Sequence, residues 1–542
     1  MLTILLSFAA AAQEPPARRL LPADRDAPGC ALDVRRDGKI IEAAATGAAN
    51  LEDRTPINPE TVFEIGSVSK QFIGAGLAIL ADRGRLSLDD PIPKWLPELP
   101  PLYGGVTISM LAHHTSGIRN WNNLAELSGV GEDSTGYDNA WVLRAVSRQR
   151  RLNNAPGADY LYSNSNFVLA AIIVERASGQ RLNDFFRDAL FARLGMTRTR
   201  WRTDFREIVP GRAQAYAPNG RGGWRLDMPF NDVAGAGGLL STVGDLQRWN
   251  AMLAKPTPGD RAWVTMLERP GRLSDGTTLR YGMGLETDPV SGIAAFSHAG
   301  STASYRAWLG RLPAQRLSVA LLCNSGVVNT EDLGQEVAAL FLPASNPGLA
   351  QSPVPVAVSV PEDLAGKYRN LANDASVEAN VDSSGLHLNG GVGFGLNPAG
   401  RLATADSKRT ITVKRDGRGA LISLSVTRIG NSPIVLVPVP AWRPLEPELL
   451  QLVGRYTTPE IMGVQHIEIK GRELIWRDPS GATHPLVPAY RDAFEAPGTA
   501  WTLRFRRARD GAPAAVDFSI TRARKIRFFR GSPNSRTKSA AD

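Results

Sequence analysis

A serine and a lysine three residues apart are the side chains of this 542-residue chain best suited to chemistry. In Ser67-Val68-Ser69-Lys70, a helix with ~3.6 residues per turn would place both on one face, with the Lys70 amine beside the Ser67 hydroxyl. A serine hydroxyl becomes a good nucleophile when a neighbour removes its proton, and lysine can do so when burial lowers its pKa from about 10.4. Spacing alone is weak evidence, because Ser535-Arg536-Thr537-Lys538 repeats it in a polar tail, residues 533–542, that we expect to be disordered.

The element that must hold this pair is a helix over residues 67–83. Ile73, Leu77 and Leu80 form an apolar stripe at i, i+4 and i+7, and most of the remaining circumference is apolar too. Such a helix belongs in the middle of a domain.

Strand patterns stand at both ends of the region around this helix. A hairpin is predicted over residues 28–48, and helices and loops follow it to about residue 255. In this region of helices and loops, the glycine-rich segment 234–238 predicts a tight turn. Three strand-like runs come next, at residues 293–296, 305–312 and 317–323. This order predicts an α+β fold, an α/β sandwich closed by its two termini.

The length and composition indicate a folded protein of two or three domains. Apolar residues make up 43% and charged residues 21%, and we find no apolar run of ~18 residues that would span a membrane. The net charge of +9 suggests an anionic partner, but basic residues over 503–530 alternate with apolar ones, as on the solvent side of strands. Without a nucleic-acid motif, we expect no nucleic-acid partner.

The first twelve residues resemble a secretory signal peptide. An apolar run at 2–8 precedes four alanines at 9–12, although the usual basic leader is missing. A frayed N-terminus is the alternative. Export would place the mature protein in the periplasm or outside the cell, in an oxidising compartment.

The cysteines and histidines do not predict a metal site. Cys30 and Cys323 are too few for a disulfide scaffold, and each lies in an apolar strand-like run that favours a buried free thiol. The six histidines form no His-Glu-x-x-His cluster. No Gly-x-Ser-x-Gly elbow occurs either, which argues against the common hydrolase sheet with a Ser-His-Asp triad.

The C-terminal half has a different pattern of apolar and polar residues. A Pro-rich linker is predicted at residues 346–358, followed by short alternating runs separated by turns. Leu364-Ala365-Gly366-Lys367-Tyr368 is similar to Leu452-Val453-Gly454-Arg455-Tyr456, with coincidence as the alternative to a true repeat. We therefore predict two small β-barrels in tandem, at 359–446 and 447–532.

Two more segments change the meaning of the Ser67-Lys70 pair. In chain order, Ser67-x-x-Lys70, Tyr162-Ser163-Asn164 and His298-Ala299-Gly300 resemble the three motifs of the serine β-lactamase and penicillin-recognising family. The resemblance covers about residues 25–345, and segments 61–72, 114–118 and 239–245 agree with it. Each motif alone has a simpler explanation: Asn164 as a helix cap, Tyr162 as a core aromatic, His298 as a strand-edge residue. Jointly they favour a β-lactamase-like catalytic domain at 13–345.

The resemblance implies a role for each motif residue. Ser67 would attack a carbonyl and become acylated, with Lys70 and Tyr162 sharing the proton transfers. His298 would tune the electrostatics of the site and pass protons to Tyr162. No metal or organic cofactor is needed.

The same resemblance implies a set of substrate contacts. Asn164 would bind the substrate amide, and Gly300 would let the substrate backbone lie against its strand. The backbone N–H groups of Ser67 and Ser301 would form an oxyanion hole, worth ~3 kcal/mol per donor. In this fold the first and last sheet strands are neighbours, so Cys30 and Cys323 can lie close enough to bridge.

Departures from the family pattern indicate the substrate. β-Lactamases commonly carry Lys-Thr-Gly as the third motif, whereas His298 is mostly neutral near pH 7, which makes β-lactam hydrolysis doubtful. Two barrels after the catalytic domain resemble D-aminopeptidases, in which a loop of the last barrel enters the cleft. The corresponding stretch is about 476–482, where Asp478 would bind a substrate amine or simply form a hairpin tip.

These features predict a serine hydrolase that forms an acyl-Ser67 intermediate and cleaves D-amino-acid-containing peptides or amides. A carboxylesterase or weak β-lactamase of the same family is an alternative. A non-catalytic penicillin-binding or peptidoglycan-sensing protein is a second. The expected partner is a small peptide or amide, and a homo-oligomer is possible.

Overall fold

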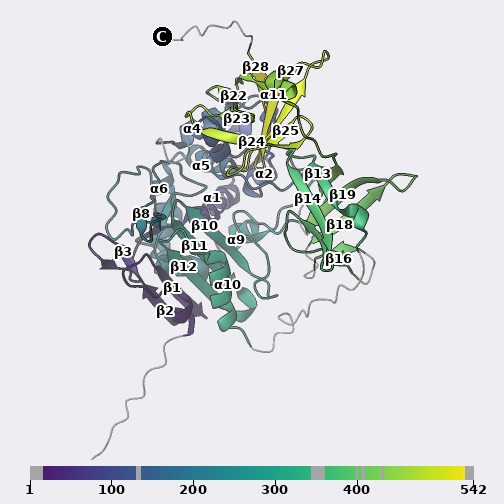
Figure 1. Cartoon of the computed structure of the whole chain (residues 1–542). Helices are drawn as coiled ribbons and strands as arrows, with labels where there is room; N and C mark the ends of the chain where they lie inside the picture. Colours follow the sequence, from purple (N-terminus) through teal and green to yellow (C-terminus); the bar gives the residue numbers. More distant parts are fainter. Residues whose placement is uncertain are drawn as a thin grey trace, which may run out of the picture.

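The computed structural model describes residues 16–129, 136–343, 360–397, 401–404, 409–428 and 432–531. The predicted signal peptide at 1–12, the linker at 346–358 and the tail at 533–542 lie outside the described residues. Figure 1 shows an α/β domain that contains the first half of the chain, a green β-domain beside it and a yellow β-barrel above its helices. The predicted fold class, a β-lactamase-like α/β sandwich followed by two small antiparallel barrels, is confirmed.

A five-stranded antiparallel sheet forms the centre of the first domain, in the order β10-β11-β12-β1-β2. Its strands are β1 (Cys30–Arg36), β2 (Lys39–Thr46), β10 (Phe296–Thr302), β11 (Tyr305–Leu312) and β12 (Leu317–Cys323). Because β1 pairs with β12, the two ends of the domain close the sheet, as predicted.

One strand prediction is wrong. The run 293–296 is not a strand; β10 begins at Phe296 and continues to Thr302, so it contains the entire third motif. Glycine weakens a strand pattern, which is why the sequence concealed this one. A Cβ atom at Gly300 would lie 2.1 Å from the carbonyl oxygen of Ile65, so the close packing of this strand requires glycine.

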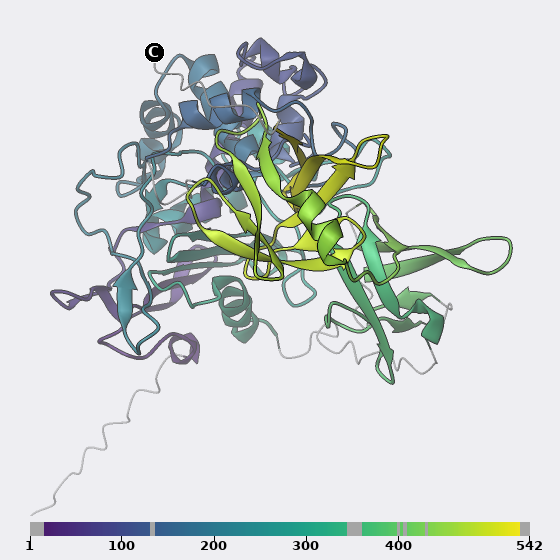
Figure 2. The same cartoon turned by 45° about the horizontal axis from the view of Figure 1, so that its top comes forward.

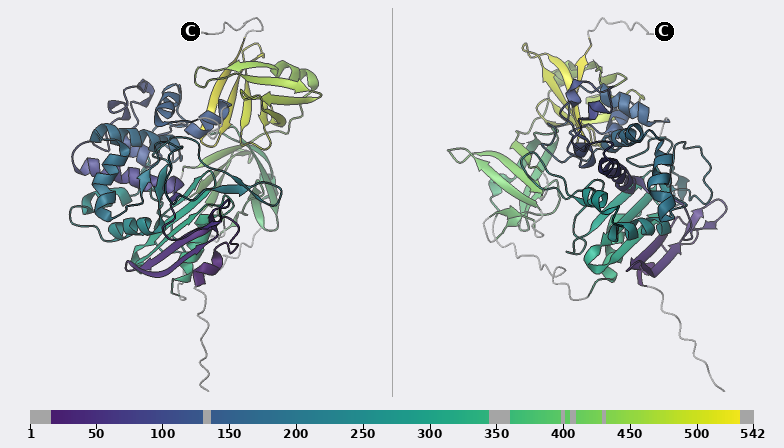
Figure 3. Two further views of the ribbon diagram at one scale, coloured as in Figure 1. Left: turned by 90° about the vertical axis from the view of Figure 1, so that its left-hand side faces the viewer. Right: turned by 180° about the vertical axis from the view of Figure 1, so that it is seen from behind.

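Helices cover both faces of the sheet. The helix α10 (Thr330–Leu340) packs on the face that carries Leu321 and Cys323, and α8 (Val243–Ala254) packs on the opposite face, where Leu322 points. Figure 3 (left) shows most of the helices as a block on one side of this sheet. Alternating strand residues therefore serve two separate cores.

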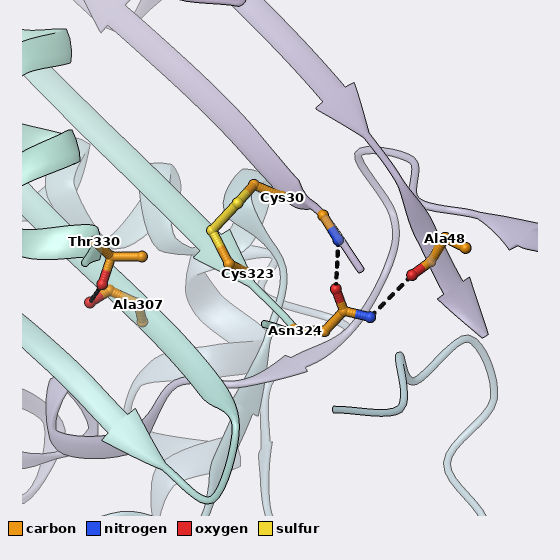
Figure 4. The surroundings of a disulfide bond; sticks show 7 residues. Cys30, Ala48, Ala307, Cys323, Asn324 and Thr330 are labelled. Atoms are coloured by element: carbon orange, nitrogen blue, oxygen red, sulfur yellow. Dashed lines mark hydrogen bonds between the residues drawn. A yellow bond between two sulfur atoms is a disulfide. The ribbon is translucent and has the colours of Figure 1, made fainter. Parts of the chain in front are cut away.

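A disulfide joins the first and last strands of the sheet. Cys30 stands opposite Cys323, with Cα atoms 4.1 Å apart. Figure 4 shows it beside Asn324, whose side chain accepts the N–H of Gly29 and donates to the carbonyl of Ala48. The local sequence favoured two free thiols, and this expectation is wrong. The two cysteines form the bridge that the family resemblance allowed.

The helix α1 (Lys70–Asp82) runs through the interior of the domain, and its residues 70–80 are all buried, as its apolar circumference predicts. The described part of the domain has further helices, of which α5, with 15 residues, is the longest. They are α2 (Ile108–Ala112), α3 (Trp121–Leu127), α4 (Asn139–Ser147), α5 (Asn164–Ser178), α6 (Leu182–Phe186), α7 (Ala192–Leu194) and α9 (Arg261–Glu268). Minor strands are β3 (Ala48–Asn50), β4 (Thr55–Pro56), β5 (Phe63–Glu64), β6 (Arg200–Trp201), β7 (Tyr216–Pro218), β8 (Trp224–Leu226) and β9 (Leu239–Ser241).

In the part of the chain that the structure describes, each C-terminal β-domain has eight strands. In the first, a bridge between Leu386 and Phe394 brings the two edges of the sheet together. Its strands are β13 (Gly366–Asn370), β14 (Ser376–Asp382), β15 (Gly385–Leu388), β16 (Gly395–Leu396), β17 (Leu402–Ala403), β18 (Arg409–Arg415), β19 (Leu421–Arg428) and β20 (Ile434–Pro438). The second follows α11 (Glu446–Leu452) and is a closed barrel. Its strands are β21 (Gly454–Thr457), β22 (Gln465–Lys470), β23 (Glu473–Arg477), β24 (Thr483–Tyr490), β25 (Ala493–Glu495), β26 (Thr502–Arg507), β27 (Pro513–Ile520) and β28 (Ala523–Arg530).

The short sequence repeat has a structural counterpart. The hydroxyl of Tyr368 donates to the carbonyl of Leu364, and that of Tyr456 donates to the carbonyl of Leu452, each at 2.8 Å. Both tyrosines are buried at the start of their barrels. The repeated residues thus form the same contact twice.

The second barrel is packed firmly on the catalytic domain, and Figure 2 shows it lying across that domain. Leu124 and Leu127 of α3 belong to the apolar core of the barrel. Arg119 and Glu460, which are 1% and 7% exposed, form an ion pair of 2.5 Å across the interface. No helix in the described ranges has the length and apolarity needed to cross a membrane.

Candidate active site

Ser67 and Lys70 lie at the start of α1. Ser67 belongs to the short 3₁₀ turn Gly66–Ser69, and Lys70 is the first residue of the helix. The Lys70 amine is fully buried, with its nitrogen 2.9 Å from Ser67 Oγ, 3.0 Å from Asn164 Oδ1 and 2.7 Å from the Ala236 carbonyl oxygen. The structure therefore brings the predicted nucleophile and base into hydrogen-bonding contact.

The environment of Lys70 favours a neutral amine. Burial lowers its pKa well below the usual value; the nearby Arg522 cation lowers it further, and Glu286 opposes this shift. A neutral amine has two N–H donors and one lone pair. The Ala236 carbonyl and the Asn164 amide oxygen can only accept, whereas a hydroxyl can also donate. The lone pair therefore faces Ser67.

A glycine-rich turn brings the Ala236 carbonyl to Lys70. Gly235 and Gly238 both have positive φ, at 115° and 86°, where other residues are strained. A Cβ atom at Gly235 would lie 2.4 Å from the Phe167 carbonyl oxygen. The prediction of a tight turn at 234–238 is confirmed, and its role in holding the lysine comes from the structure.

Tyr162 lies against the same amine. The Lys70 nitrogen is 4.9 Å from the centre of the Tyr162 ring, and the tyrosine side chain is hydrogen-bonded to Ser67. Burial raises the pKa of Tyr162, so its resting form is the phenol. The ring also packs against buried His114, with centroids 4.2 Å apart and ring planes inclined by 36°. Tyr162 can thus exchange protons within the Ser67-Lys70 pair.

Asn164 is the first residue of α5, but its side chain does not cap this helix. Its Oδ1 accepts from Lys70 and its Nδ2 donates to Asn122 Oδ1 at 2.9 Å. Its backbone N–H donates to Asn120 Oδ1 at 2.8 Å. The side chain is therefore part of the site and not only of the helix terminus.

His298 has a different partner from the one predicted. Its Nδ1 lies 2.6 Å from the Ala299 carbonyl, which can only accept, so Nδ1 carries the proton and Nε2 accepts the Tyr281 hydroxyl at 2.9 Å. Burial is the main cause that lowers the pKa of His298, to about 3, so the ring is neutral. Its centroid is 6.2 Å from that of Tyr162. Both ring nitrogens of His298 thus bond to groups other than Tyr162. A proton could pass from His298 to Tyr162 only after these hydrogen bonds change.

Gly300 and Ser301 bring the third motif alongside the nucleophile. A Cβ atom at Gly300 would collide with Ile65, so packing requires glycine here. Gly300 also lines the cleft, and its contact with the substrate stays a prediction. Likewise, a Cβ atom at Gly66 would lie 2.5 Å from the Ser301 nitrogen. Two glycines thus permit β10 to lie directly against the Ser67 turn, and Ser301 lines the cleft.

The cleft above Ser67 has a volume of about 630 Å³. Predicted residues that line it are Ser67, Tyr162, Asn164, His298, Gly300 and Ser301. Unpredicted ones include Glu286, Glu331, Arg306 and Arg522. Lys70 is buried and is not among the residues that line the cleft.

Asp478 is not among the residues that line this cleft. Its carboxylate accepts from Ser480 at 2.6 Å and lies 3.0 Å from His484 Nε2, as in an ordinary hairpin tip. The adjoining Pro479 and Ser480 pack on Gly129, at the end of α3. The barrel reaches the cleft with another hairpin, between β27 and β28, whose tip carries Arg522.

The sequence reasoning also missed Tyr281 and Asn120, which hold His298 and Asn164. Tyr281 had a signal in Tyr281-Gly282-Met283-Gly284, because a Cβ atom at Gly284 would lie 2.5 Å from the Lys70 backbone. Closely spaced glycines beside a buried aromatic indicate such an approach. Asn120 had no comparable signal.

No group of three or more His, Cys, Asp or Glu side chains within the described ranges is arranged to hold a metal ion. The groups that converge on Ser67 are a base, a phenol and amide or backbone donors. Such a set is suited to nucleophilic acyl transfer.

Several known proteins are similar to this chain. A D-aminopeptidase of Gluconobacter oxydans is 28% identical over 304 residues, which are 56% of this chain and 57% of that protein. The match thus spans less than two thirds of that relative. A D-aminopeptidase of Cereibacter sphaeroides is 26% identical over 527 residues, 93% of this chain and 96% of that protein. The octameric penicillin-binding protein homologue from Pyrococcus abyssi aligns with a TM-score of 0.52 and 22% identity, over 83% of this chain and 94% of that one.

The family model named Beta-lactamase matches residues 10–341, more than half of the chain. Its match includes the Ser67, Tyr162 and His298 motifs that the structure gathers around one cleft. The chain therefore belongs to the Beta-lactamase family and is a serine hydrolase.

Proposed function

We propose that the protein hydrolyses peptides or amides of D-amino acids, in the manner of a D-aminopeptidase, through an acyl-Ser67 intermediate. The observation that carries the chemistry is the contact between a buried, neutral Lys70 and Ser67 Oγ. Similarity to a D-aminopeptidase over 96% of that protein's length supports the substrate class.

Acylation begins at the Ser67 hydroxyl. Lys70 takes its proton while Oγ bonds to the substrate carbonyl carbon, and the carbonyl oxygen becomes an oxyanion. The backbone N–H groups of Ser67 and Ser301 are the candidate donors to this oxyanion. Ser67 lies in the turn that leads into α1, where a helix N-terminus favours negative charge.

Tyr162 is the candidate acid for the leaving group. When the C–N bond breaks, the phenol gives its proton to the departing nitrogen, and the Lys70 ammonium returns a proton to the phenolate. For hydrolysis, the same groups take a proton from water as it attacks the acyl carbon, and Ser67 regains its proton as the ester bond breaks. Asn164 is the candidate contact for the substrate amide.

The neutral His298 supports an ordinary amide over a β-lactam. Lysine at this position would provide a fixed cation for the carboxylate of a β-lactam, whereas burial keeps His298 uncharged. His298 is positioned to orient Tyr281 and the strand, and not to attract an anion.

One substrate panel tests the proposal. Wild type and Ser67→Ala are assayed with the p-nitroanilides of D-Ala and L-Ala, a chromogenic cephalosporin and a p-nitrophenyl ester. We expect D-over-L amide turnover in the wild type and its loss in the variant. Ester turnover without amide turnover would indicate a carboxylesterase, and cephalosporin turnover a β-lactamase. If nothing turns over and a labelled penicillin fails to modify Ser67, the protein is a binding module.

We also propose that the protein works in an oxidising compartment, the periplasm or the exterior of the cell. The Cys30–Cys323 disulfide supports this location, because such bonds rarely persist in a reducing cytosol. A homo-oligomer remains part of the proposal, since the Pyrococcus abyssi homologue is described as octameric. Fractionation of cells and light scattering of the purified protein test these two points.

A further inference from the structure

Two arginines line the cleft, and they differ in what their guanidinium groups contact. Arg306 donates to the backbone carbonyls of Ala303, Tyr305 and Gly326 at 2.6, 2.8 and 3.0 Å. The Arg522 guanidinium forms no hydrogen bond or ion pair with the described residues, and its Cζ lies 4.8 Å from the centre of the Tyr162 ring. Arg306 therefore serves the fold, whereas the donors of Arg522 face the cleft.

The backbone of Arg522 is held firmly although its side chain is exposed. Its carbonyl oxygen accepts from the Asn120 N–H and from Asn153 Nδ2, each at 3.0 Å. Asn153 Oδ1 also accepts the N–H of Arg524 at 2.7 Å. The catalytic domain thus fixes both sides of this hairpin tip, and stacking on Tyr162 limits the side-chain conformers. A preorganised cation of this kind loses little entropy when it binds a ligand.

The positive charge of Arg522 is not neutralised locally. Glu286 and Glu331 line the same cleft, but neither forms an ion pair with it. Burial and the neighbouring Glu331 and Asp288 charges raise the pKa of Glu286 to about 8, so this carboxyl is mainly uncharged at neutral pH. The charge of Arg522 instead acts on buried groups of the site, where it lowers the pKa of Lys70 and of His114.

The position of Arg522 indicates which part of a substrate it meets. It stacks on Tyr162, the candidate proton donor to the departing nitrogen, whereas Asn164 is the candidate contact for the acyl part. A guanidinium binds a carboxylate through two parallel N–H···O bonds, a geometry that the neutral His298 ring cannot provide.

We propose that Arg522, supplied by the second barrel, binds the carboxylate of the departing amino acid. The preferred substrates are then short peptides in which a D-residue is followed by one residue with a free C-terminal carboxylate. This inference rests on the proposed function and narrows its substrate class. The second barrel would thus supply a positive charge to the cleft. In enzymes with a Lys-Thr-Gly motif, the lysine on the strand supplies this charge.

A pair of substrates that differ only in this carboxylate tests the inference. Wild type, Arg522→Gln and Arg522→Lys are assayed with D-Ala-Gly, D-Ala-glycinamide and D-Ala p-nitroanilide. We expect wild type to have a KM for D-Ala-Gly ~10-fold or more below that for the amide, Arg522→Gln to remove this preference, and Arg522→Lys to retain part of it. The ratio of the KM values for D-Ala-Gly and D-Ala-glycinamide is the readout, because Arg522→Gln also shifts the pH dependence of p-nitroanilide turnover through Lys70. Equal losses on all three substrates would indicate a positioning role and overturn the inference.

Binding measured without turnover separates this inference from the proposed function. In a Ser67→Ala background, calorimetry compares D-Ala-Gly with D-Ala-glycinamide, with and without Arg522→Gln. A carboxylate preference that depends on Arg522 supports the inference even if the p-nitroanilide is never hydrolysed. Absence of that preference overturns it even if D-amides are hydrolysed. Arg509→Gln, which removes an exposed arginine from another hairpin of the same barrel, is the matched control and should bind as the parent does.

Discussion

The backbone N–H of Asn120 donates a 3.0 Å hydrogen bond to the carbonyl oxygen of Arg522, and its side-chain oxygen accepts the N–H of Asn164 at 2.8 Å. Asn164 in turn accepts from the Lys70 amine. Two asparagines therefore connect the tip of the C-terminal barrel to the catalytic lysine. The barrel is part of the active site, so its removal should alter the chemistry as well as the stability of the protein.

Lys70→Met should abolish most of the activity. Methionine fills a similar volume but cannot accept the Ser67 proton, and loss of a general base costs about 10²- to 10⁴-fold in rate. The measurement is kcat for D-Ala p-nitroanilide, with thermal melting as a check of folding. Lys538→Met, in the tail copy of the Ser-x-x-Lys spacing, is the control and should leave kcat unchanged. A Lys70→Met enzyme with more than a tenth of normal activity would contradict the assignment.

Tyr162→Phe should harm amide hydrolysis more than ester hydrolysis. An amine must be protonated as it leaves, whereas p-nitrophenolate leaves without a proton, so only the amide needs the phenol during acylation. We expect a loss of about 10²-fold or more in kcat/KM, which reports acylation, for the p-nitroanilide and a much smaller loss in kcat/KM for the p-nitrophenyl ester. Equal losses on both substrates would show that Tyr162 acts before the leaving group departs.

The acid limb of the pH–rate profile should report Lys70. The reactive form is the neutral amine, so activity is lost as the pH falls through the pKa of Lys70 in the folded protein. Arg522 lowers that pKa. Arg522→Gln should therefore move the acid limb to higher pH, whereas Glu286→Gln should leave it nearly in place, because a carboxyl with a pKa of about 8 is mainly protonated at lower pH. The measurement is kcat/KM for D-Ala p-nitroanilide, and a shift of the acid limb to lower pH in Arg522→Gln would refute the assignment.

The sequence was sufficient where function depends on local spacing. Ser67 and Lys70 are three residues apart, so the backbone alone brings them together, and the interior helix that holds them has an unmistakable apolar pattern. Tyr162 and Asn164 could be assigned because the order of three motifs restricts the fold. The pairing of Cys30 with Cys323 followed from that fold and not from the local sequence, which favoured free thiols.

The sequence was insufficient where a contact joins distant segments through the backbone or across domains. The Ala236 carbonyl that holds Lys70 could come from any residue type. Arg522 is one of many arginines in the last barrel, and only the docking of this barrel selects it. For the same reason the sequence left two roles open for Asp478, on another hairpin of this barrel, and the structure shows it in an ordinary hairpin tip.

Replacement of both cysteines by serine should lower the thermal stability. The bridge between Cys30 and Cys323 closes a segment with a sequence separation of 293, so its loss frees a very long loop in the unfolded chain. We expect a loss of about 2–4 kcal/mol and a Tm roughly 5 °C or more lower. A reducing agent should lower the Tm of wild type but not of the double variant. Titration of two free thiols in denatured, unreduced protein would disprove the bridge.

Glu460→Gln should weaken the attachment of the second barrel. The change leaves the cation of Arg119 buried without its carboxylate, and such a loss costs about 3–5 kcal/mol. Glu98→Gln is the matched control, because Arg176 and Glu98 form a pair that is 36% and 46% exposed, worth less than about 1 kcal/mol. Urea denaturation measures both variants.

Arg119 also donates to the Arg524 carbonyl, two residues beyond Arg522. Glu460→Gln should therefore reduce the preference for D-Ala-Gly over its amide while D-Ala p-nitroanilide is still hydrolysed. An unchanged preference in a destabilised variant would show that the hairpin tip is held by its asparagine contacts alone.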